Sequence, residues 1–542
     1  MAAEYDYIIV GAGSAGCVLA SRLSANPKTR VLVIEAGGSD RHYLVSLPKG
    51  IAKLATDPRF TWQYAVEQPR MAGMPASEVW IRGKGLGGSS SINGMIYVRG
   101  QPEDYDQWGR LGATGWDWQT MKSAFRAIED YDLGDDSLTG QGGPLHISTG
   151  TYRYPISEAL IEAGEQMGLN RKDGHNREEQ EGVGYLSHNI KRGKRQSAAT
   201  VFLRPAMKRG NVDVVTHAVA ERILFEGRRA VGVRVRVNGQ SVEYRTRGEV
   251  ILSCGTIESP RLLQLSGIGP AARLASLGIA PVADSPDVGE KMLEHLAFAL
   301  PFRMEGKGSI NSQFYGLGLA RQLVRYYLFR DGPLATGPFE VGVFARTRPE
   351  VDRPNLQIYL SAFTFARGDD NHPMPAAIEH KPGITAMCQL MRLESRGSIR
   401  IRSNNPDDPL QITPNWLSTA NDQQDAIDSV RYMRRYMAQQ ALAPYRLTEL
   451  LPGRECQSDE DILAAYRRLS SSGLHGIGTC RMGSDPQAVV DPRGRVNGVD
   501  RLRVVDCSIM PALTSGNTNG PTMALAWHAA DLILEDARAA NR

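Results

Sequence analysis

A histidine and an asparagine near the C-terminal end are residue types that can assist the oxidation of an alcohol. His475 lies in Ser-Gly-Leu-His-Gly-Ile-Gly-Thr-Cys-Arg-Met-Gly (472–483), and Asn519 lies in Ser-Gly-Asn-Thr-Asn-Gly-Pro-Thr (515–522). A neutral imidazole with a pKa near ~6.5 can take a hydroxyl proton, and an amide can donate a hydrogen bond to the developing alkoxide. The hydride needs a redox cofactor, so the pair predicts this chemistry only beside one.

A glycine-rich turn at the N-terminal end predicts such a cofactor. Residues 7–10 form an apolar run typical of a buried strand, and Gly-Ala-Gly-Ser-Ala-Gly follows at 11–16. Apolar residues then recur at helical spacing, and a second strand over 30–34 ends in Glu35. This order of strand, turn, helix, strand and acid is the context of a dinucleotide-binding fingerprint.

Each residue of the turn has a physical role in that prediction. Gly11 permits the tight turn, Gly13 lets the backbone approach a pyrophosphate, and Gly16 lets helix and strand pack closely. The free N–H groups at the start of the helix attract the phosphates. Glu35 would accept hydrogen bonds from the adenosine ribose and would repel a 2′-phosphate, so NADP is disfavoured. FAD and NAD both remain open on this segment alone.

Two further segments are rich in small residues. Residues 82–100 alternate glycine and serine with Leu, Ile, Met and Tyr, which suits a backbone lying against a planar ligand rather than a flexible linker. Residues 254–269 follow an apolar strand over 250–253. A helix is expected there, beginning at Pro260 and ending at Gly267.

The segments 83–100 and 255–269 resemble the two signature motifs of the glucose–methanol–choline (GMC) oxidoreductases, FAD-dependent alcohol oxidases and dehydrogenases. The N-terminal turn and the region of His475 and Asn519 match the same family, so the resemblance covers nearly the whole chain apart from about 302–463. It is nearer to the bacterial choline dehydrogenase-like and hydroxymethylfurfural oxidase-like branch than to glucose oxidase. The resemblance implies that the cofactor is FAD.

The resemblance also assigns residues to the cofactor. The expected FAD-binding residues are Gly11, Gly13, Ser14, Ala15, Gly16, Glu35, Ala36, Arg82, Gly87, Gly88, Ser89, Ser90, Asn93, Gly94, Met95, Ile96, Val219, Cys254, Gly255, Asp506, Asn519, Pro521 and Thr522. Some relatives carry a histidine bonded to the flavin just before the asparagine of the first signature. Ile92 stands there in this chain, so non-covalent FAD is expected.

In the family the first residue of His-x-x-Gly-Thr-Cys-Arg-Met-Gly is the catalytic base, which assigns that role to His475. Its partner is a second histidine or an asparagine, here taken as Asn519. Asn519 could equally be the N-cap of the apolar helix expected over 520–534, and both roles can hold at once. His295 matches a boundary motif of the family and is expected to be structural.

The expected fold class is α/β, with a Rossmann-like FAD-binding domain and a second substrate domain built on an antiparallel sheet flanked by helices. The FAD-binding domain is expected over 1–150, 196–298 and 466–542, and the substrate-binding domain over 151–195 and 299–465. Alternating residues over 355–360 and 397–402 predict strands of that sheet. The expected walls of the substrate pocket are Phe339, Phe363, Phe365 and Leu474.

Composition narrows the remaining classes of function. A net charge of +4 on 542 residues, without a strip of Lys and Arg, disfavours nucleic-acid binding. The six cysteines form no Cys-x-x-Cys pair and no histidines have metal-ligand spacing, so no metal is expected. The scattered cysteines also fit a reducing compartment. No apolar stretch approaches the ~20 residues of a membrane span. A cytoplasmic monomer or homodimer is expected.

The substrate and the electron acceptor stay open. A primary alcohol of the aryl, allylic or furanic kind is the preferred substrate, with dioxygen or a quinone-type compound as acceptor. Alternatives are choline dehydrogenase-type activity, a hydroxynitrile lyase on the same flavin fold, an NAD-dependent dehydrogenase, and a flavin-binding regulatory protein without turnover. A quaternary ammonium would need an aromatic cage with a nearby carboxylate, which the sequence does not assign.

Overall fold

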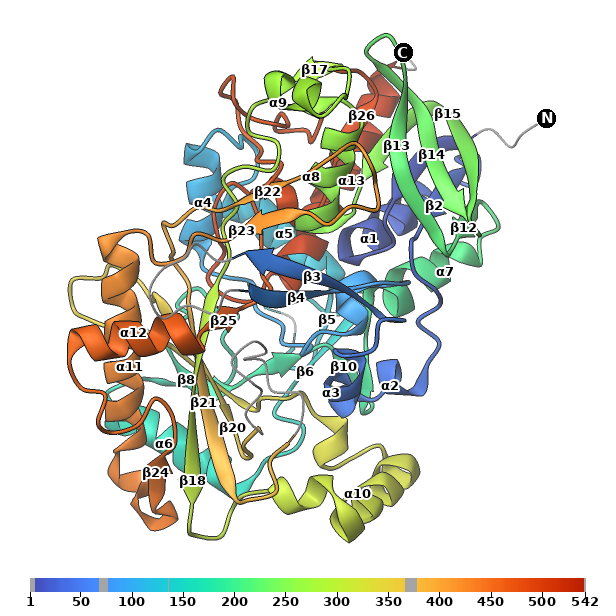
Figure 1. Cartoon of the computed structure of the whole chain (residues 1–542). Helices are drawn as coiled ribbons and strands as arrows, with labels where there is room; N and C mark the ends of the chain where they lie inside the picture. The colour runs from blue at the N-terminus through green and yellow to red at the C-terminus, as the bar shows by residue number, and fades with distance from the viewer. Residues whose placement is uncertain (1–4, 68–76, 135, 366–377, 541–542) are drawn as a thin grey trace.

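Two sheets, one with a parallel core and one mainly antiparallel, organise the chain (Figure 1). The structure is a computed structural model that describes residues 5–67, 77–134, 136–365 and 378–540. The expected α/β fold class is confirmed, because helices and both kinds of sheet are present. The predicted domain limits remain a prediction.

The first sheet contains the predicted dinucleotide turn. Its strands run in the order β12 (Val212–Val215), β2 (Val31–Ile34), β1 (Tyr5–Val10), β15 (Gln240–Leu252), β14 (Arg229–Val237) and β13 (Ala218–Glu226), with β26 (Leu502–Val504) also against β15. Strand β1 pairs in parallel with both β2 and β15. The long β15 also pairs with β14, antiparallel, and so joins the parallel strands to the β13–β14 hairpin.

Two helices cover the turn at the end of β1. Helix α1 (Ser14–Leu23) starts directly after the turn, and α13 (Asn519–Ala540), from the other end of the chain, packs against it. Gly11 has φ +100°, and a Cβ on Gly16 would lie 1.9 Å from the Gly11 carbonyl oxygen. Only glycine fits both positions, as the fingerprint predicted. Helix α13 starts one residue earlier and ends six residues later than the expected 520–534.

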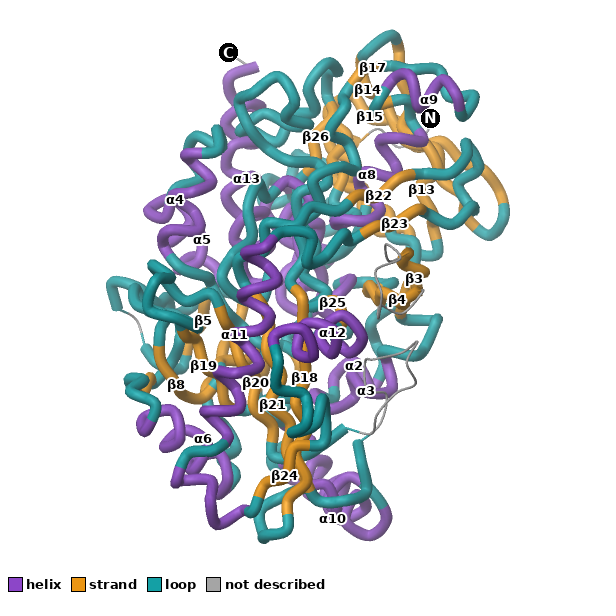
Figure 2. The backbone as a smooth tube through the Cα atoms, turned by 60° about the vertical axis from the view of Figure 1, so that its left-hand side comes forward, coloured by secondary structure: helices purple, strands orange, loops and turns teal. Residues whose placement is uncertain are grey.

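The second sheet is the larger one. Its strands run in the order β24 (Leu447–Glu449), β18 (Leu296–Met304), β21 (Gly383–Leu390), β20 (Leu356–Ser361), β19 (Val341–Ala345), β8 (Gly182–Tyr185) and β7 (Arg171–Lys172), with β25 (Ser471–Ser472) also on β18. Helices α6 (Pro155–Gln166), α11 (Ala420–Met437) and α12 (Asp459–Leu469) contact these strands (Figure 2).

Strand register brings the side chains of one face of this sheet together. Ala297 lies opposite Gln389, Ala299 opposite Met387, and Pro301 opposite Thr385. Because side chains alternate between the two faces of a strand, these six residues share one face. All six line the large cavity described below. The antiparallel sheet therefore forms one wall of that cavity.

Smaller elements connect and cover the two sheets. In the first half of the chain these are α2 (Tyr43–Ser46), η1 (Pro48–Gly50), α3 (Ile51–Leu54), β3 (Thr61–Glu67), β4 (Ser77–Gly83), η2 (Gly88–Ser91), α4 (Pro102–Arg110), α5 (Trp118–Ile128), β5 (Glu129–Tyr131), β6 (Leu145–Thr149), β9 (Ser187–His188), β10 (Ile190–Lys191), β11 (Lys194–Arg195), η3 (Ala199–Leu203), α7 (Arg204–Met207) and α8 (Gly255–Leu265). In the second half they are β16 (Ile268–Gly269), α9 (Ala271–Ser276), β17 (Ala283–Asp284), η4 (Asn311–Phe314), α10 (Gly316–Phe329), η5 (Pro333–Ala335), β22 (Ser398–Arg400), β23 (Gln411–Thr413), η6 (Gln440–Tyr445) and η7 (Cys507–Ile509).

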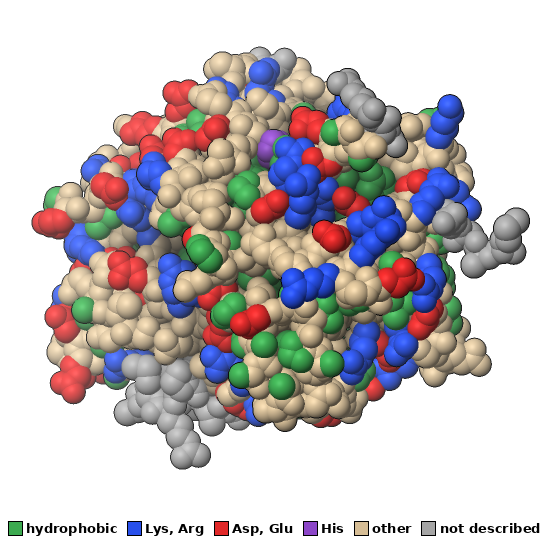
Figure 3. Space-filling view, turned by 90° about the horizontal axis from the view of Figure 1, so that it is seen from above, with side chains coloured by type: hydrophobic (Ala, Val, Ile, Leu, Met, Phe, Trp, Pro, Cys, Tyr) green, Lys and Arg blue, Asp and Glu red, His purple; other side chains and the backbone are tan. Residues whose placement is uncertain are grey.

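The surface carries mixed charge. Basic and acidic side chains are interspersed on the face seen in Figure 3. Within the described ranges, no helix is both long and apolar enough to cross a bilayer. All six cysteines are free thiols.

Candidate active site

The backbone around His475 is held in place by the sheet wall. The N–H of Gly473 donates to the carbonyl of His295 (2.7 Å), and the N–H of His475 donates to Oε1 of Glu294 (2.6 Å). Leu474, between them, has φ +62°, a conformation rarely adopted by a residue with a side chain. The segment is thus fixed in an unusual turn that presents the imidazole to the cavity.

Both ring nitrogens of His475 have side-chain partners. Nδ1 lies 3.1 Å from Nδ1 of His295, and Nε2 lies 3.2 Å from Nδ2 of Asn517. The Asn517 oxygen accepts from Gln357 Nε2 (3.3 Å) and lies 3.2 Å from the Tyr359 hydroxyl, which leaves its NH₂ group for His475. An NH₂ donor requires a lone pair on Nε2 of His475. Its proton therefore lies on Nδ1 and is donated to His295.

The surroundings keep this imidazole neutral. Burial lowers the pKa of His475 well below its ordinary 6.5, and His295 and Arg82 lower it further. Burial also lowers the pKa of His295 to about 4. Both rings are therefore uncharged at neutral pH, and Nε2 of His475 is available to accept a proton.

The side chain at hydrogen-bond distance from Nε2 of His475 is that of Asn517. The structure does not place the predicted partner, Asn519, there. Asn519 is the first residue of α13, and its side-chain oxygen accepts from the Ser14 hydroxyl (2.7 Å) at the dinucleotide turn. It is not the N-cap either, since the Thr518 carbonyl accepts the first helical bond from Thr522. Asn517 lies in the loop just before α13 and Asn519 is the first helical residue, and their side chains have different partners. The sequence signal for Asn517 was present, in the same short Asn-Thr-Asn segment.

One continuous cavity of about 580 Å³ joins the dinucleotide turn to His475. Most of the predicted residues line it: Gly11, Gly13, Ser14, Ala15, Glu35, Ala36, Arg82, Gly88, Ser89, Asn93, Gly94, Met95, Ile96, Val219, Cys254, Gly255, Asp506, Asn519, Thr522, Phe339, Phe365 and Leu474. The structure does not bring five others to it: Gly16, Gly87, Ser90, Pro521 and Phe363. Phe363 packs instead against Phe314 in the core, with the ring centroids 5.1 Å apart.

The dinucleotide end of the cavity is preorganised by Glu35. Its carboxylate accepts the N–H groups of Ala12 (2.9 Å), Gly37 (2.8 Å) and Gly85 (3.0 Å). Because a carboxylate has about four acceptor positions, one remains for a ribose hydroxyl. A Cβ on Gly88 would lie 2.8 Å from the Gly13 Cα, so two glycine backbones meet here as the floor of a narrow cradle. These residues fit an extended dinucleotide.

Arg195 holds the second glycine-rich segment, and the sequence did not point to it. Its buried guanidinium donates to the carbonyls of Val45, Ser90 and Asn93 and to the Asn93 side chain (2.8 Å). The Asn93 oxygen also accepts from the N–H of Met95, which has φ +63°. The tight turn at 93–95 is therefore set by hydrogen bonds and lies on the cavity wall.

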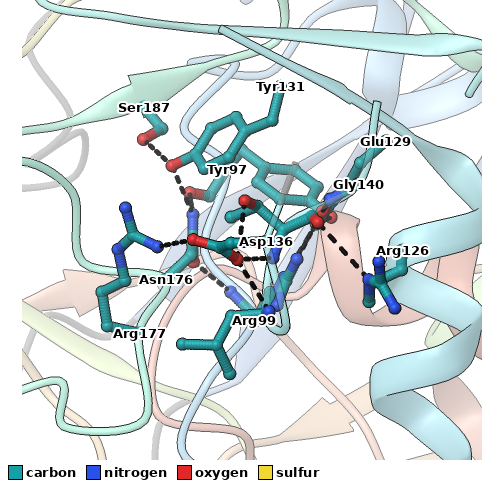
Figure 4. A network of polar contacts seen from close by, with 12 residues as sticks. Tyr97, Arg99, Arg126, Glu129, Tyr131, Asp136, Gly140, Asn176, Arg177 and Ser187 are labelled. Carbon is teal, nitrogen blue, oxygen red and sulfur yellow. Dashed lines mark hydrogen bonds and ion pairs between the residues drawn. The ribbon is translucent and has the colours of Figure 1, made fainter. Parts of the chain in front are cut away.

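A buried polar network anchors the chain just beyond that turn (Figure 4). Glu129 accepts from the Tyr97 hydroxyl (2.6 Å) and pairs with the guanidinium of Arg99 (Nε, 2.7 Å). Asn176 accepts from the Arg99 N–H and donates to the Tyr97 carbonyl. Arg99 and Glu129 are both fully buried, so removing either one would leave an unpaired charge inside the protein.

The start of α8 differs from the prediction. The helix begins at Gly255, five residues before Pro260, which lies inside it. Proline has no N–H for the carbonyl four residues earlier, that of Thr256. This carbonyl accepts instead from the Thr479 hydroxyl (2.7 Å), in the loop that follows His475. Asp506 accepts from the N–H of Gly255 (2.9 Å), so three distant segments meet at the start of α8.

The wall near His475 is mostly apolar. Phe339 lies between Tyr359 (ring centroids 5.3 Å apart) and Phe365 (6.2 Å). Leu474, Met387, Ala297 and Ala299 add apolar surface to this part of the lining, beside the polar side chains of Gln389 and Thr385.

Among the described residues that line the cavity, the carboxylates are those of Glu35, Glu258 and Asp506. Each has protein partners: backbone N–H groups for Glu35, Tyr64 and Arg261 for Glu258, and Gly255 and Ser259 for Asp506.

Comparison with known proteins identifies the family to which this arrangement belongs. Residues 5–297 match the N-terminal part, and residues 394–526 the C-terminal part, of the GMC oxidoreductases. The chain is 41% identical to human mitochondrial choline dehydrogenase over 98% of its length and 90% of the relative. It is also 41% identical to the "alcohol dehydrogenase [acceptor]" of Pseudomonas putida, covering 98% of this chain and 96% of that one. The crystal structure of pyridoxine 4-oxidase from Mesorbium loti superposes with a TM-score of 0.88 at 32% identity, covering 98% and 99% of the two chains.

Proposed function

Because the chain belongs to the GMC oxidoreductase family of FAD-dependent enzymes that act on alcohols, we propose that it oxidises an uncharged primary alcohol to the aldehyde, with His475 as the general base. The observation that carries the proposal is the neutral imidazole whose Nε2 lone pair faces the cavity beside the amide of Asn517. A substrate hydroxyl bound between the two would give its proton to Nε2. The NH₂ group of Asn517 would donate to the same oxygen as it gains negative charge.

The residues that would hold FAD are those of the cradle described above. Gly13, Gly88 and the start of α1 fit the pyrophosphate, and Glu35 fits the ribose. FAD supplies the acceptor for the hydride that leaves the carbinol carbon. The protein would orient that carbon through His475 and Asn517.

The lining supports an uncharged substrate over choline. The aromatic side chains of Phe339, Tyr359 and Phe365 could face a quaternary ammonium group. However, among the carboxylates of the described cavity residues, Glu258 is already paired with Arg261, Glu35 bonds the dinucleotide turn, and Asp506 bonds the start of α8. None of them is bonded to this aromatic group, so it offers choline no carboxylate of its own. An aryl, allylic or furanic alcohol matches the apolar wall and needs no counter-charge. Choline oxidation, the activity named for several relatives, is the second candidate.

Both candidate functions, oxidation of an uncharged alcohol and oxidation of choline, are tested in one assay. The purified holoenzyme is mixed anaerobically with benzyl, allyl and furfuryl alcohols and with choline, and the visible flavin band is followed. Fast bleaching by the neutral alcohols and slow bleaching by choline is the expected result. The reverse order would assign choline. Bleaching by none of them would contradict alcohol oxidation of this kind and favour the lyase. Air is then admitted to identify the electron acceptor. Rapid return of the flavin colour indicates dioxygen, and slow return indicates a quinone-type acceptor.

The role of His475 is tested in the same assay. Replacement by alanine is expected to leave FAD bound and to slow reduction by ~10²–10⁴-fold, the usual contribution of a general base. An unchanged rate of reduction in this variant would rule out the assignment.

A further inference from the structure

Helix α10 exposes an unusual amount of apolar surface. Leu317 is 91% exposed, Leu328 69% and Phe329 72%, and Val324 and Tyr327 are also more than half exposed. Within the described residues, ten large hydrophobic side chains are exposed, and five of them lie on this helix. Single exposed apolar residues are common, but a group of this kind on one element marks an interaction surface.

This surface is not the result of a poorly packed helix. Leu319, Leu323 and Tyr326 on its other face already pack against Phe314, Leu334 and Leu47. Leu317, Val324 and Leu328 are spaced by seven and four residues, which places them along one stripe. Both ribbon views show α10 at one end of the molecule, far from the β13–β14 hairpin (Figures 1 and 2). The stripe therefore faces outward from a helix that is firmly seated.

The charge of the helix indicates the kind of partner. Residues 316–330 contain Arg321, Arg325 and Arg330 and no Asp or Glu. Arg325 pairs with Asp331 after the helix, Arg330 stacks on Tyr326 and Tyr327, and the helix keeps a net positive charge. An apolar stripe with basic residues suits the headgroup layer of an anionic bilayer. A second copy of the chain, related by a twofold axis, would instead bring the same arginines together.

We propose that α10 docks the protein on the surface of an anionic lipid bilayer, with the stripe of Leu317, Val324 and Leu328, and Phe329 beside it at the end of the helix, inserted among the headgroups. The docking is peripheral. It goes beyond the alcohol oxidation proposed above and does not depend on it.

The position of α10 gives this docking a consequence for the active site. Helix α10 contacts η5, η5 contacts η1, and η1 continues into α3, whose Ile51 and Ala52 line the cavity. A docked α10 would thus hold this cavity wall near the lipid, where apolar alcohols and quinone-type acceptors dissolve. This consequence of docking would appear as faster turnover with a lipid-dissolved quinone when the vesicles are anionic.

Flotation of the holoenzyme with vesicles tests the docking. Vesicles of phosphatidylcholine are compared with vesicles of phosphatidylcholine and phosphatidylglycerol. We expect wild-type protein to float with the anionic vesicles and high salt to weaken this. The variant Leu317→Ser/Leu328→Ser/Phe329→Ser should bind at least about tenfold more weakly. The matched control, Leu111→Ser/Met207→Ser/Val242→Ser, changes three exposed apolar residues elsewhere and should float like wild type.

Three results would overturn the proposal. These are no flotation of wild-type protein with anionic vesicles, equal flotation with neutral ones, or equal flotation of the α10 variant and its control. Sedimentation velocity adds a further check: a wild-type dimer that the α10 variant converts to a monomer would assign the stripe to self-association instead. Bleaching of the flavin by alcohols should be the same in all variants, so failure of the docking and failure of the proposed function are distinguishable.

Discussion

The Nδ1 atoms of His295 and His475 lie 3.1 Å apart, so one ring donates to the other. Asn517 donates to the opposite nitrogen of His475, which makes His475 the donor toward His295. His295, expected from the sequence to be merely structural, thus accepts the Nδ1 proton in the tautomer that leaves a lone pair on Nε2. It is a positioning residue, since it acts through His475.

Substitution of His295 tests this positioning role. His295→Leu removes the acceptor for the Nδ1 proton, and flavin reduction by alcohol is expected to slow by about 10- to 100-fold. His295→Asn keeps an acceptor near the same place and should recover most of the rate.

The pH profile separates positioning from general damage. Protonated His475 cannot act as a base, so the rate falls as the pH drops through its pKa. His295 helps to lower that pKa, so His295→Leu should move the acid limb to higher pH. Equal rates and equal acid limbs for the Leu variant and wild type would contradict the role.

The two asparagines should behave differently. Asn517→Ala removes the donor that faces the substrate oxygen and is expected to slow reduction by ~10²-fold or more at full FAD occupancy. Asn519→Ala removes the acceptor of the Ser14 hydroxyl and should act mainly on FAD retention. Stopped-flow reduction, normalised to bound flavin, gives both comparisons. A larger effect of Asn519 on the rate would restore it as the catalytic partner.

Gly88 should control cofactor binding. A Cβ there would lie 2.8 Å from the Gly13 Cα, and the φ of +51° disfavours a side chain. Gly88→Ala is therefore expected to hold FAD at least about tenfold more weakly, because the two backbones must separate. Gly109→Ala, in α4 with no atom within 4 Å of its Cβ, is the matched control. The ratio of flavin to protein absorbance after dialysis measures the difference, and equal ratios would refute the cradle.

Buried histidines should make the fold sensitive to acid. Burial, with a smaller contribution from Lys49, lowers the pKa of His188 to about 4. Because the folded state holds this group neutral, its contribution is present above pH ~6.5 and is lost as the pH falls toward 4, roughly 3 kcal/mol in all. His188→Gln should therefore show a smaller drop in thermal midpoint between about pH 7.5 and 5 than wild type. The exposed His380→Gln should match wild type, and equal drops in all three would contradict the assignment.

Local rules made the dinucleotide site predictable. The turn at Gly11, the close packing at Gly16 and the acid at the end of β2 all depend on residues within one strand–helix–strand unit. Within such a unit, backbone sterics and strand pairing leave few alternatives, so the residues alone determined the site. His475 was found as the candidate base for another reason, the specific motif that contains it.

Tertiary structure decided what the motif left open. Asn517 and Asn519 are chemically identical and two residues apart, and their side-chain contacts differ because α13 begins at Asn519 and leaves Asn517 in the preceding loop. Phe363 lies in the core and Phe365 on the cavity, and Arg195 and His295 reach the site from distant segments. Such choices depend on where one helix starts and on which segments pack together. The sequence by itself determined the chemistry available at the site, and the packing of distant segments decided which side chain faces the substrate.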